Sequence, residues 1–172
     1  TCALPISEDV KRKITAKTKA IVAVHWAGQP FEIDQINKIA IKNNLKVVED
    51  AAHALGAKFN GKIIGSHSDY VCFSFQAIKH LTTGDGGALT CKTETEYERI
   101  KKLRWFGLNR KYVGPKWEQD IIESGFKYHM NNINAIIGIE SMKNINYILD
   151  KHIENGKYYD LNINNPKIQK LR

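Results

Sequence analysis

The chain has 172 residues, of which 42% are hydrophobic and 26% are charged, so it can bury a globular core and is not expected to be disordered. The formal net charge is +8, but the basic residues are spread along the chain, which disfavours nucleic-acid binding and favours attraction of a small anionic substrate or cofactor phosphate. No apolar stretch reaches the roughly 18 residues of a membrane helix, and residues 1–5 lack a signal-peptide layout, so we expect a soluble, cytoplasmic protein without a membrane partner.

The first fifty residues predict a parallel α/β unit. Residues 20–25 form a short β-branched run typical of a buried strand. Residues 33–45 carry isoleucine, alanine and leucine at helical spacing, and residues 46–50 form a second short strand that ends on a carboxylate. A strand, a helix and a strand within about thirty residues are typical of a parallel sheet.

Two further strands are predicted at residues 70–75 and 86–91, after a hairpin turn at residues 60–61. The segment between these two strands is polar and rich in glycine. Residues 94–105 are predicted to be helical, and a loop rich in glycine, lysine and aromatic residues follows up to about residue 128.

Polar residues predict where the later helices begin. Thr93 or Thr95 can cap the helix at 94–105, and Asn131 or Asn132 can cap the next one. That next helix is predicted to turn one apolar face inward, formed by Ile133, Ile136, Ile137 and Met142. A last helix is predicted at about residues 147–161.

Neither a disulfide framework nor a metal site is predicted. The three cysteines, Cys2, Cys72 and Cys91, are far apart and form no CxxC pair. Cys72 and Cys91 lie in apolar runs and are most simply core residues. The six histidines show no HExxH or other paired spacing.

Three polar side chains follow predicted strands. Asp50 ends the second strand, Ser74 lies near the end of the third, and Lys79 comes five residues later. Each alone has an ordinary explanation as a cap, a backbone partner or a solvated lysine. Because ligands gather at the carboxyl ends of parallel strands, the three together could hold pyridoxal phosphate (PLP) by its ring nitrogen, phosphate and aldehyde.

Three stretches carry a resemblance to a known family: EDAAHALG at residues 49–56, GKIIGS at 61–66 and CFSFQAIKHLTTGDGG at 72–87. Residues 24–28 and 125–131 fit as flanking pieces. Their order, spacing and identity resemble the sugar aminotransferases of the DegT/DnrJ/EryC1/StrS family. The resemblance covers most of the chain and is weakest beyond about residue 150.

The resemblance implies a role for each of five residues. Lys79 would bind the cofactor covalently and shuttle protons, and Asp50 would pair with the pyridine nitrogen and keep it protonated. Ala52 would pack against the ring face. His53 would reach the ring hydroxyl, unless it is an ordinary buried histidine, and Ser74 would bind the phosphate, unless it only satisfies a strand end.

The resemblance also implies the assembly. Lys127 stands where many relatives carry an asparagine that reaches the cofactor phosphate of the neighbouring subunit, so it would act across a homodimer or else face solvent. The fold would be α/β, with a mostly parallel sheet in three α/β/α layers, as in the large domain of the aspartate-aminotransferase-like (type I PLP) fold. Residues 1–150 would belong to this PLP-binding large domain, and residues 151–172 would begin the connection to a truncated C-terminal small domain.

The implied function is transamination of a nucleotide-diphosphate keto-deoxysugar with an amino-acid donor, glutamate in most relatives, for amino-sugar and polysaccharide biosynthesis. Two alternatives stay open. One is a sugar dehydratase of the same family, in which histidine replaces the cofactor-binding lysine; Lys79 argues against it, although His80 lies next door. The other is a non-catalytic regulatory module that keeps the fold, which the presence of both Asp50 and Lys79 disfavours.

Overall fold

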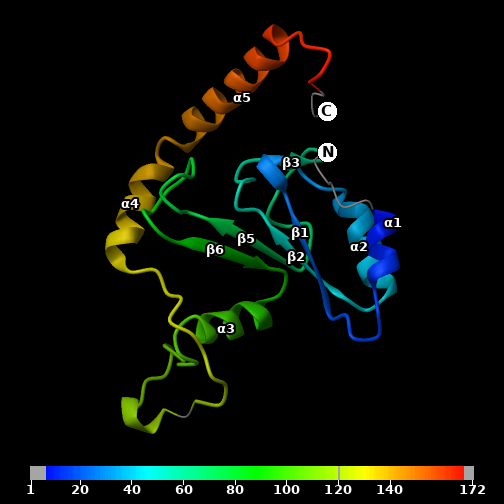
Figure 1. Ribbon diagram of the computed structural model, residues 1–172. Helices are drawn as coiled ribbons and strands as arrows, with labels where there is room; N and C mark the ends of the chain where they lie inside the picture. Colours follow the sequence, from blue (N-terminus) through cyan, green and yellow to red (C-terminus); the bar gives the residue numbers. More distant parts are fainter. Residues whose placement is uncertain (1–6, 120, 169–172) are drawn as a thin grey trace.

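The computed structural model describes residues 7–119 and 121–168, and a four-stranded sheet lies at its centre (Figure 1). The predictions for residues 1–5 and Cys2 lie outside these ranges. The strands of the sheet are β1 (Ala20–Val24), β2 (Lys46–Asp50), β5 (Tyr70–Ser74) and β6 (Gly87–Cys91). The predicted turn at residues 60–61 joins a small hairpin made of β3 (Lys58–Phe59) and β4 (Lys62–Ile63).

The helices lie close to their predicted positions, except that the first was not predicted. They are α1 (Ser7–Lys13), α2 (Ile33–Lys42), α3 (Glu94–Leu103), α4 (Asn132–Met142) and α5 (Ile145–Asn162), with short 3-10 turns η1 (Trp26–Gly28) and η2 (Lys116–Glu118). Thr93 Oγ1 accepts a hydrogen bond from Glu96 N at 3.2 Å, and Asn131 Oδ1 accepts one from Asn134 N at 2.9 Å. These two residues are therefore the helix caps among the predicted alternatives.

The sheet is mostly parallel, which confirms the predicted α/β class. Its order is β1-β2-β5-β6; β1 and β5 both run parallel to β2, and β6 is antiparallel to β5. Asp50 pairs with Val24 on one side and with Cys72 on the other. Three strands therefore end at the same edge of the sheet.

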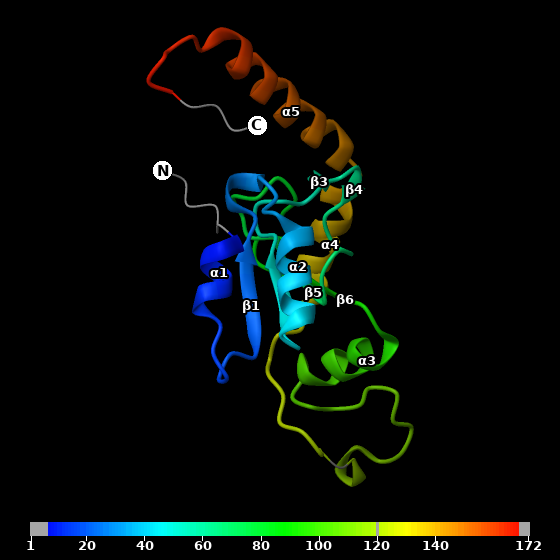
Figure 2. The ribbon, with the colours of Figure 1, turned by 90° about the vertical axis from the view of Figure 1, so that its right-hand side faces the viewer.

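The core lies between α2 and one face of the sheet. The buried stripe of α2 is formed by Ile33, Ile36, Ile39 and Ala40, and it packs with Val47 and Val71 of the strands. Helices α1 and α2 lie together on this side (Figure 2). On the opposite face Val22 and Leu89 remain exposed. The described residues thus cover one face of the sheet much better than the other.

Truncation of the α2 stripe should destabilise the protein. Ile36 is 1% exposed, so Ile36→Ala is expected to lower the free energy of unfolding by about 2–5 kcal/mol through lost burial and a residual cavity. Ile41 lies on the same helix but is 80% exposed, so Ile41→Ala should change the free energy of unfolding by less than about 0.5 kcal/mol. Urea unfolding followed by circular dichroism measures both, and equal effects would contradict this description of the core.

The prediction that α4 turns its apolar face inward is wrong for this chain. Ile133, Ile136, Ile137 and Met142 are between 42% and 74% exposed. The helix lies at the side of the sheet, and α5 continues away from it in both views (Figures 1 and 2). Within the described residues, no element covers these side chains. Among the described helices, none combines the length and the apolarity needed to span a membrane.

Candidate active site at the carboxyl edge of the sheet

The ends of β2 and β5 bring two of the predicted site residues to one face of the sheet. Asp50 is directly paired with Cys72, and paired residues of neighbouring strands point to the same side. Ser74 follows two positions later on β5, so it lies on this face as well. Burial first, and then the nearby Asp50 carboxylate, raise the pKa of the Cys72 thiol. Cys72 is partly buried beside the site and is not part of the main core.

The Asp50 carboxylate is held by its own turn. Its Oδ1 accepts a hydrogen bond from Ala52 N at 3.0 Å. Among the described residues this is the only hydrogen bond to the carboxylate, so Oδ2 can accept from a ligand. The partly buried Ala52 adds no bulk beside it. An acceptor of this kind suits a protonated ring nitrogen.

His53 lies at the rim of the same site. Its side chain is exposed, which excludes the alternative of an ordinary buried histidine. Its ring meets the exposed indole of Trp26 edge to face, with centroids 6.0 Å apart. A Cβ on Gly28 would come within 3.0 Å of the His53 carbonyl oxygen, so the η1 turn packs closely against this segment. Trp26 was not singled out from the sequence, where it read as part of a loop.

The loop that carries Lys79 folds back onto the end of β5. Phe75 N donates to Gly86 O at 2.8 Å, and Thr83 N donates to Phe75 O at 2.9 Å. Lys79 itself is partly buried, and its backbone N donates to Gln76 O at 2.9 Å. Within residues 7–119 and 121–168, its amine has no ion-pair partner.

His80 connects this loop to the segment after Asp50. Its Nε2 donates to the carbonyl oxygen of Leu55 at 2.9 Å, and its ring lies 5.8 Å from that of His152. The side chain of His80 therefore links the Lys79 loop to the segment around Leu55. The same bond draws the Lys79 loop towards the turn that follows Asp50.

Ser74 occupies the strand end as predicted. Its Oγ accepts a hydrogen bond from Gln76 N at 3.3 Å, which leaves the hydroxyl proton available for an anion. The alternative that Ser74 only satisfies the strand end is therefore correct in part, because its hydroxyl oxygen accepts the backbone N–H of Gln76. That bond does not consume the donor that a phosphate would need.

The structure does not bring Lys127 to this edge. It is exposed and forms an isolated bridge with Trp105, which follows α3. Helix α3 packs near the opposite ends of the strands, since Glu96 accepts from the hydroxyl of Tyr70 at 2.7 Å, at the start of β5. Lys127 is thus remote from Asp50 within one chain.

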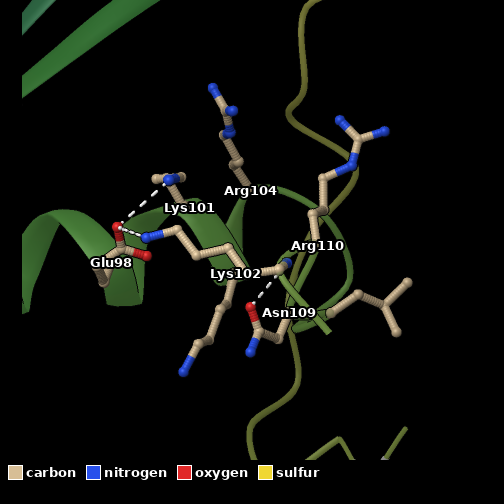
Figure 3. A pocket seen from close by; sticks show the side chains of 8 residues that line it. Glu98, Lys101, Lys102, Arg104, Asn109 and Arg110 are labelled. Atoms are coloured by element: carbon tan, nitrogen blue, oxygen red, sulfur yellow. Dashed lines mark hydrogen bonds and ion pairs between the residues drawn. The ribbon is translucent and has the colours of Figure 1, made fainter. Parts of the chain in front are cut away.

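A basic pocket of about 90 Å³ lies at the end of α3, away from this edge (Figure 3). Lys101 and Lys111 both bind Glu98, at 3.3 and 2.8 Å. Arg104 and Arg110 point away from that carboxylate (Figure 3), and the guanidinium of Arg110 lies over the Trp105 ring. Because these cations do not converge, the pocket contributes positive potential without forming a site.

Sequence reasoning missed a buried polar pair beneath Asp50. His25 Nε2 donates to Glu49 Oε2 at 2.8 Å, and both side chains are 0% exposed. Glu49 comes two residues after the buried Val47 on β2, so its side chain points to the same buried face. This alternation could have revealed its burial from the sequence.

Asp50 and Ser74 share one face at the carboxyl edge of a mostly parallel sheet, and the loop that carries Lys79 follows the end of β5. This arrangement is typical of α/β proteins that bind a ligand at that edge, as the motifs predict. The chain belongs to the DegT/DnrJ/EryC1/StrS aminotransferase family, whose sequence model matches residues 3–171. The family prediction is therefore confirmed.

Similar proteins agree with this assignment. An uncharacterised protein of Methanocaldococcus jannaschii is 45% identical over 158 residues, which are 89% of this chain and 41% of that protein. GDP-perosamine synthase of Escherichia coli O157:H7 is 38% identical over 156 residues, which are 91% of this chain and 42% of that protein. The chain thus spans about two-fifths of the length of these curated relatives.

Solved structures confirm the fold. The sugar aminotransferase CalS13 of Micromonospora echinospora matches with a TM-score of 0.90 and 31% identity, over 97% of this chain and 47% of that one. Spr1654 of Streptococcus pneumoniae, solved in a PLP form, matches with a TM-score of 0.80 and 28% identity, over 90% of this chain and 43% of that one. Pyridoxal phosphate is thereby confirmed as the cofactor of the family.

Proposed function

We propose that the full-length protein is a PLP-dependent aminotransferase that moves an amino group from glutamate to the keto carbon of a nucleotide-diphosphate sugar. The observation that carries this proposal is the arrangement of Asp50, Ser74 and the Lys79 loop at one sheet edge. The relative named GDP-perosamine synthase supports a nucleotide-linked product.

The residues present fit the cofactor in their chemistry. Asp50 would hold the ring nitrogen, Ser74 the phosphate and Lys79 the aldehyde carbon. His53 would reach the ring hydroxyl, and the small Ala52 would allow the ring to lie close to the backbone. When bound, PLP supplies an electron sink for a carbanion at the donor carbon.

The proton chemistry falls to Lys79. Its partly buried amine lacks an ion-pair partner in the part of the chain that the structure describes. An amine that no carboxylate holds is available to the cofactor aldehyde, so Lys79 would act as the nucleophile and as the general base. The dehydratase alternative requires a histidine in place of this lysine, and His80 is already bonded to Leu55 O.

The assembly proposed from the sequence is a homodimer in which Lys127 reaches the partner's phosphate. Its position far from Asp50 in one chain and the exposed isoleucines of α4 support a surface covered by another copy. We also propose that residues 1–150 belong to the large domain and that residues 151–172 begin the connection to a small domain. Helix α5 extends away from the sheet, as a connection to another domain would (Figure 1). Residues 169–172 of this proposed connection lie outside the residues that the structure describes.

The test uses purified full-length protein. We expect a yellow protein whose colour is lost on addition of glutamate, because the amino group moves to the cofactor. A panel of nucleotide-linked keto-sugars should then restore the colour and gain one amino group each where accepted, as mass spectrometry would show. A protein that takes up no PLP, or that aminates none of the panel, would contradict the proposal.

A further inference from the structure

A fully buried histidine–carboxylate pair lies directly beneath the candidate site. His25 and Glu49 are both 0% exposed, and their side chains are joined by a single hydrogen bond of 2.8 Å. The His25 ring stacks on Phe31 with centroids 4.6 Å apart and an interplanar angle of 18°. Among the described residues, the buried atoms His25 Nδ1 and Glu49 Oε1 have no hydrogen-bond partner.

The stability of the fold alone does not explain why this buried pair is present. Glu49 pairs with the buried Ala23 and Val71 in the sheet. Ser68 and His67 are its polar neighbours besides His25. Replacing a buried ion pair by well-packed apolar residues is often neutral or stabilising. Burial raises the pKa of Glu49, but the hydrogen bonds from His25 and Ser68 and the nearby His67 lower it by more, so the net shift is downward and Glu49 is ionised at neutral pH. A charge kept at this buried position indicates a role beyond packing.

The pair contacts the backbone that carries Asp50. Glu49 precedes Asp50 in β2, and the two side chains point to opposite faces of the sheet. His25 N also donates to Asp50 O at 3.0 Å. One residue, His25, therefore holds Glu49 through its side chain and Asp50 through its backbone. His25 thus holds the peptide unit between Asp50 and Ala51 through its carbonyl oxygen, and it holds the Glu49 side chain on the face opposite to the Asp50 carboxylate.

We propose that His25 and Glu49 are positioning residues that aim the Asp50 carboxylate at the ring nitrogen of the cofactor. The inference rests on the proposed function. Among the described residues, the Asp50 carboxylate accepts a hydrogen bond from Ala52 N alone, so its direction depends mainly on the backbone that carries it. A loosened pair would let the carboxylate drift without removing it, and PLP would bind more weakly and in a less uniform orientation.

The test is a double-mutant cycle in the full-length protein. Glu49→Gln keeps the size of the side chain and removes its charge, and Asp50→Asn removes the charge that it is proposed to aim. With Asp50 intact, Glu49→Gln is expected to weaken PLP binding about tenfold and to reduce the visible circular dichroism of the bound cofactor. In the Asp50→Asn background the same change should alter PLP binding less than about twofold.

Two controls separate positioning from general damage. Val47→Ala lies on the same strand and face, is equally buried, and sits three positions from Asp50. It should lower thermal stability without changing PLP affinity or the dichroism. His25→Asn should reproduce the effects of Glu49→Gln if the pair acts as a unit.

The outcomes distinguish the two proposals. Wild-type protein that fails to bind PLP would overturn the proposed function and this inference with it. Normal PLP binding that Glu49→Gln leaves unchanged, or weakens equally in both Asp50 backgrounds, would overturn the positioning role alone. A Val47→Ala variant that loses PLP affinity as strongly as Glu49→Gln would reduce the pair to ordinary core packing.

Discussion

Lys79→Ala is expected to abolish covalent attachment of PLP to the full-length protein and to lower turnover by about 10⁴-fold or more. The variant loses both the nucleophile that holds the cofactor and the base that moves the proton, so two contributions disappear together. Reduction with borohydride followed by mass spectrometry should find PLP attached to Lys79 in the wild type and to no lysine in the variant. PLP should still bind without a covalent bond, because Asp50 and Ser74 remain.

A matched control comes from the β3–β4 hairpin. Lys62 is exposed on β4, and Lys62→Ala removes an equal charge at a distance from the proposed chemistry. It should leave colour and turnover within about twofold of the wild type. Turnover retained in Lys79→Ala would move the protein to a different class of enzyme, whatever its fold.

The location of the site could be predicted because it depends on short-range rules. Residues 46–50 and 70–75 each read as a strand followed by polar residues, and parallel order places both ends at one edge. The pairing of Asp50 with Cys72 agrees with that expectation. The sequence did not decide whether His53 is buried or exposed. Its exposure depends on its position beside Trp26, a contact between distant residues that no local pattern predicts.

The buried pair shows a limit of local patterns. Glu49 and Asp50 read together as a polar strand end, yet one enters the core and the other faces the site. The alternation of side chains along β2 separates them, but burial of Glu49 is tolerable because of contacts with distant residues, first of all His25, 24 positions earlier. Such a contact between distant residues follows from the register of β1 on β2.

The outward face of α4 shows a second limit. The spacing of Ile133, Ile136 and Ile137 correctly indicates a helix with apolar side chains, but periodicity does not say what covers them. In this chain nothing among the described residues does. The same reasoning applies to Lys127, whose proposed partner lies outside one copy of the chain.

Asp50→Asn is expected to lower kcat by about 10²- to 10⁴-fold while leaving the fold intact. The amide oxygen of asparagine can still accept the hydrogen bond from Ala52 N, which measures 3.0 Å in the wild type, so the turn should persist. A neutral amide cannot stabilise a protonated pyridine nitrogen, and the ring would lose its ability to accept electrons from the donor carbon. Stopped-flow absorbance with glutamate alone isolates this half-reaction.

The matched control for this change is Asp34→Asn, on the exposed side of α2, where the carboxylate accepts a hydrogen bond from Asn60 Nδ2 at 3.1 Å. It should leave the half-reaction unaltered. If Asp50→Asn slows the half-reaction while PLP stays covalently attached, Asp50 acts on the electron sink and not only on binding. A half-reaction of normal rate in Asp50→Asn would mean that another acid holds the ring nitrogen, and the assignment of this strand end would have to be abandoned.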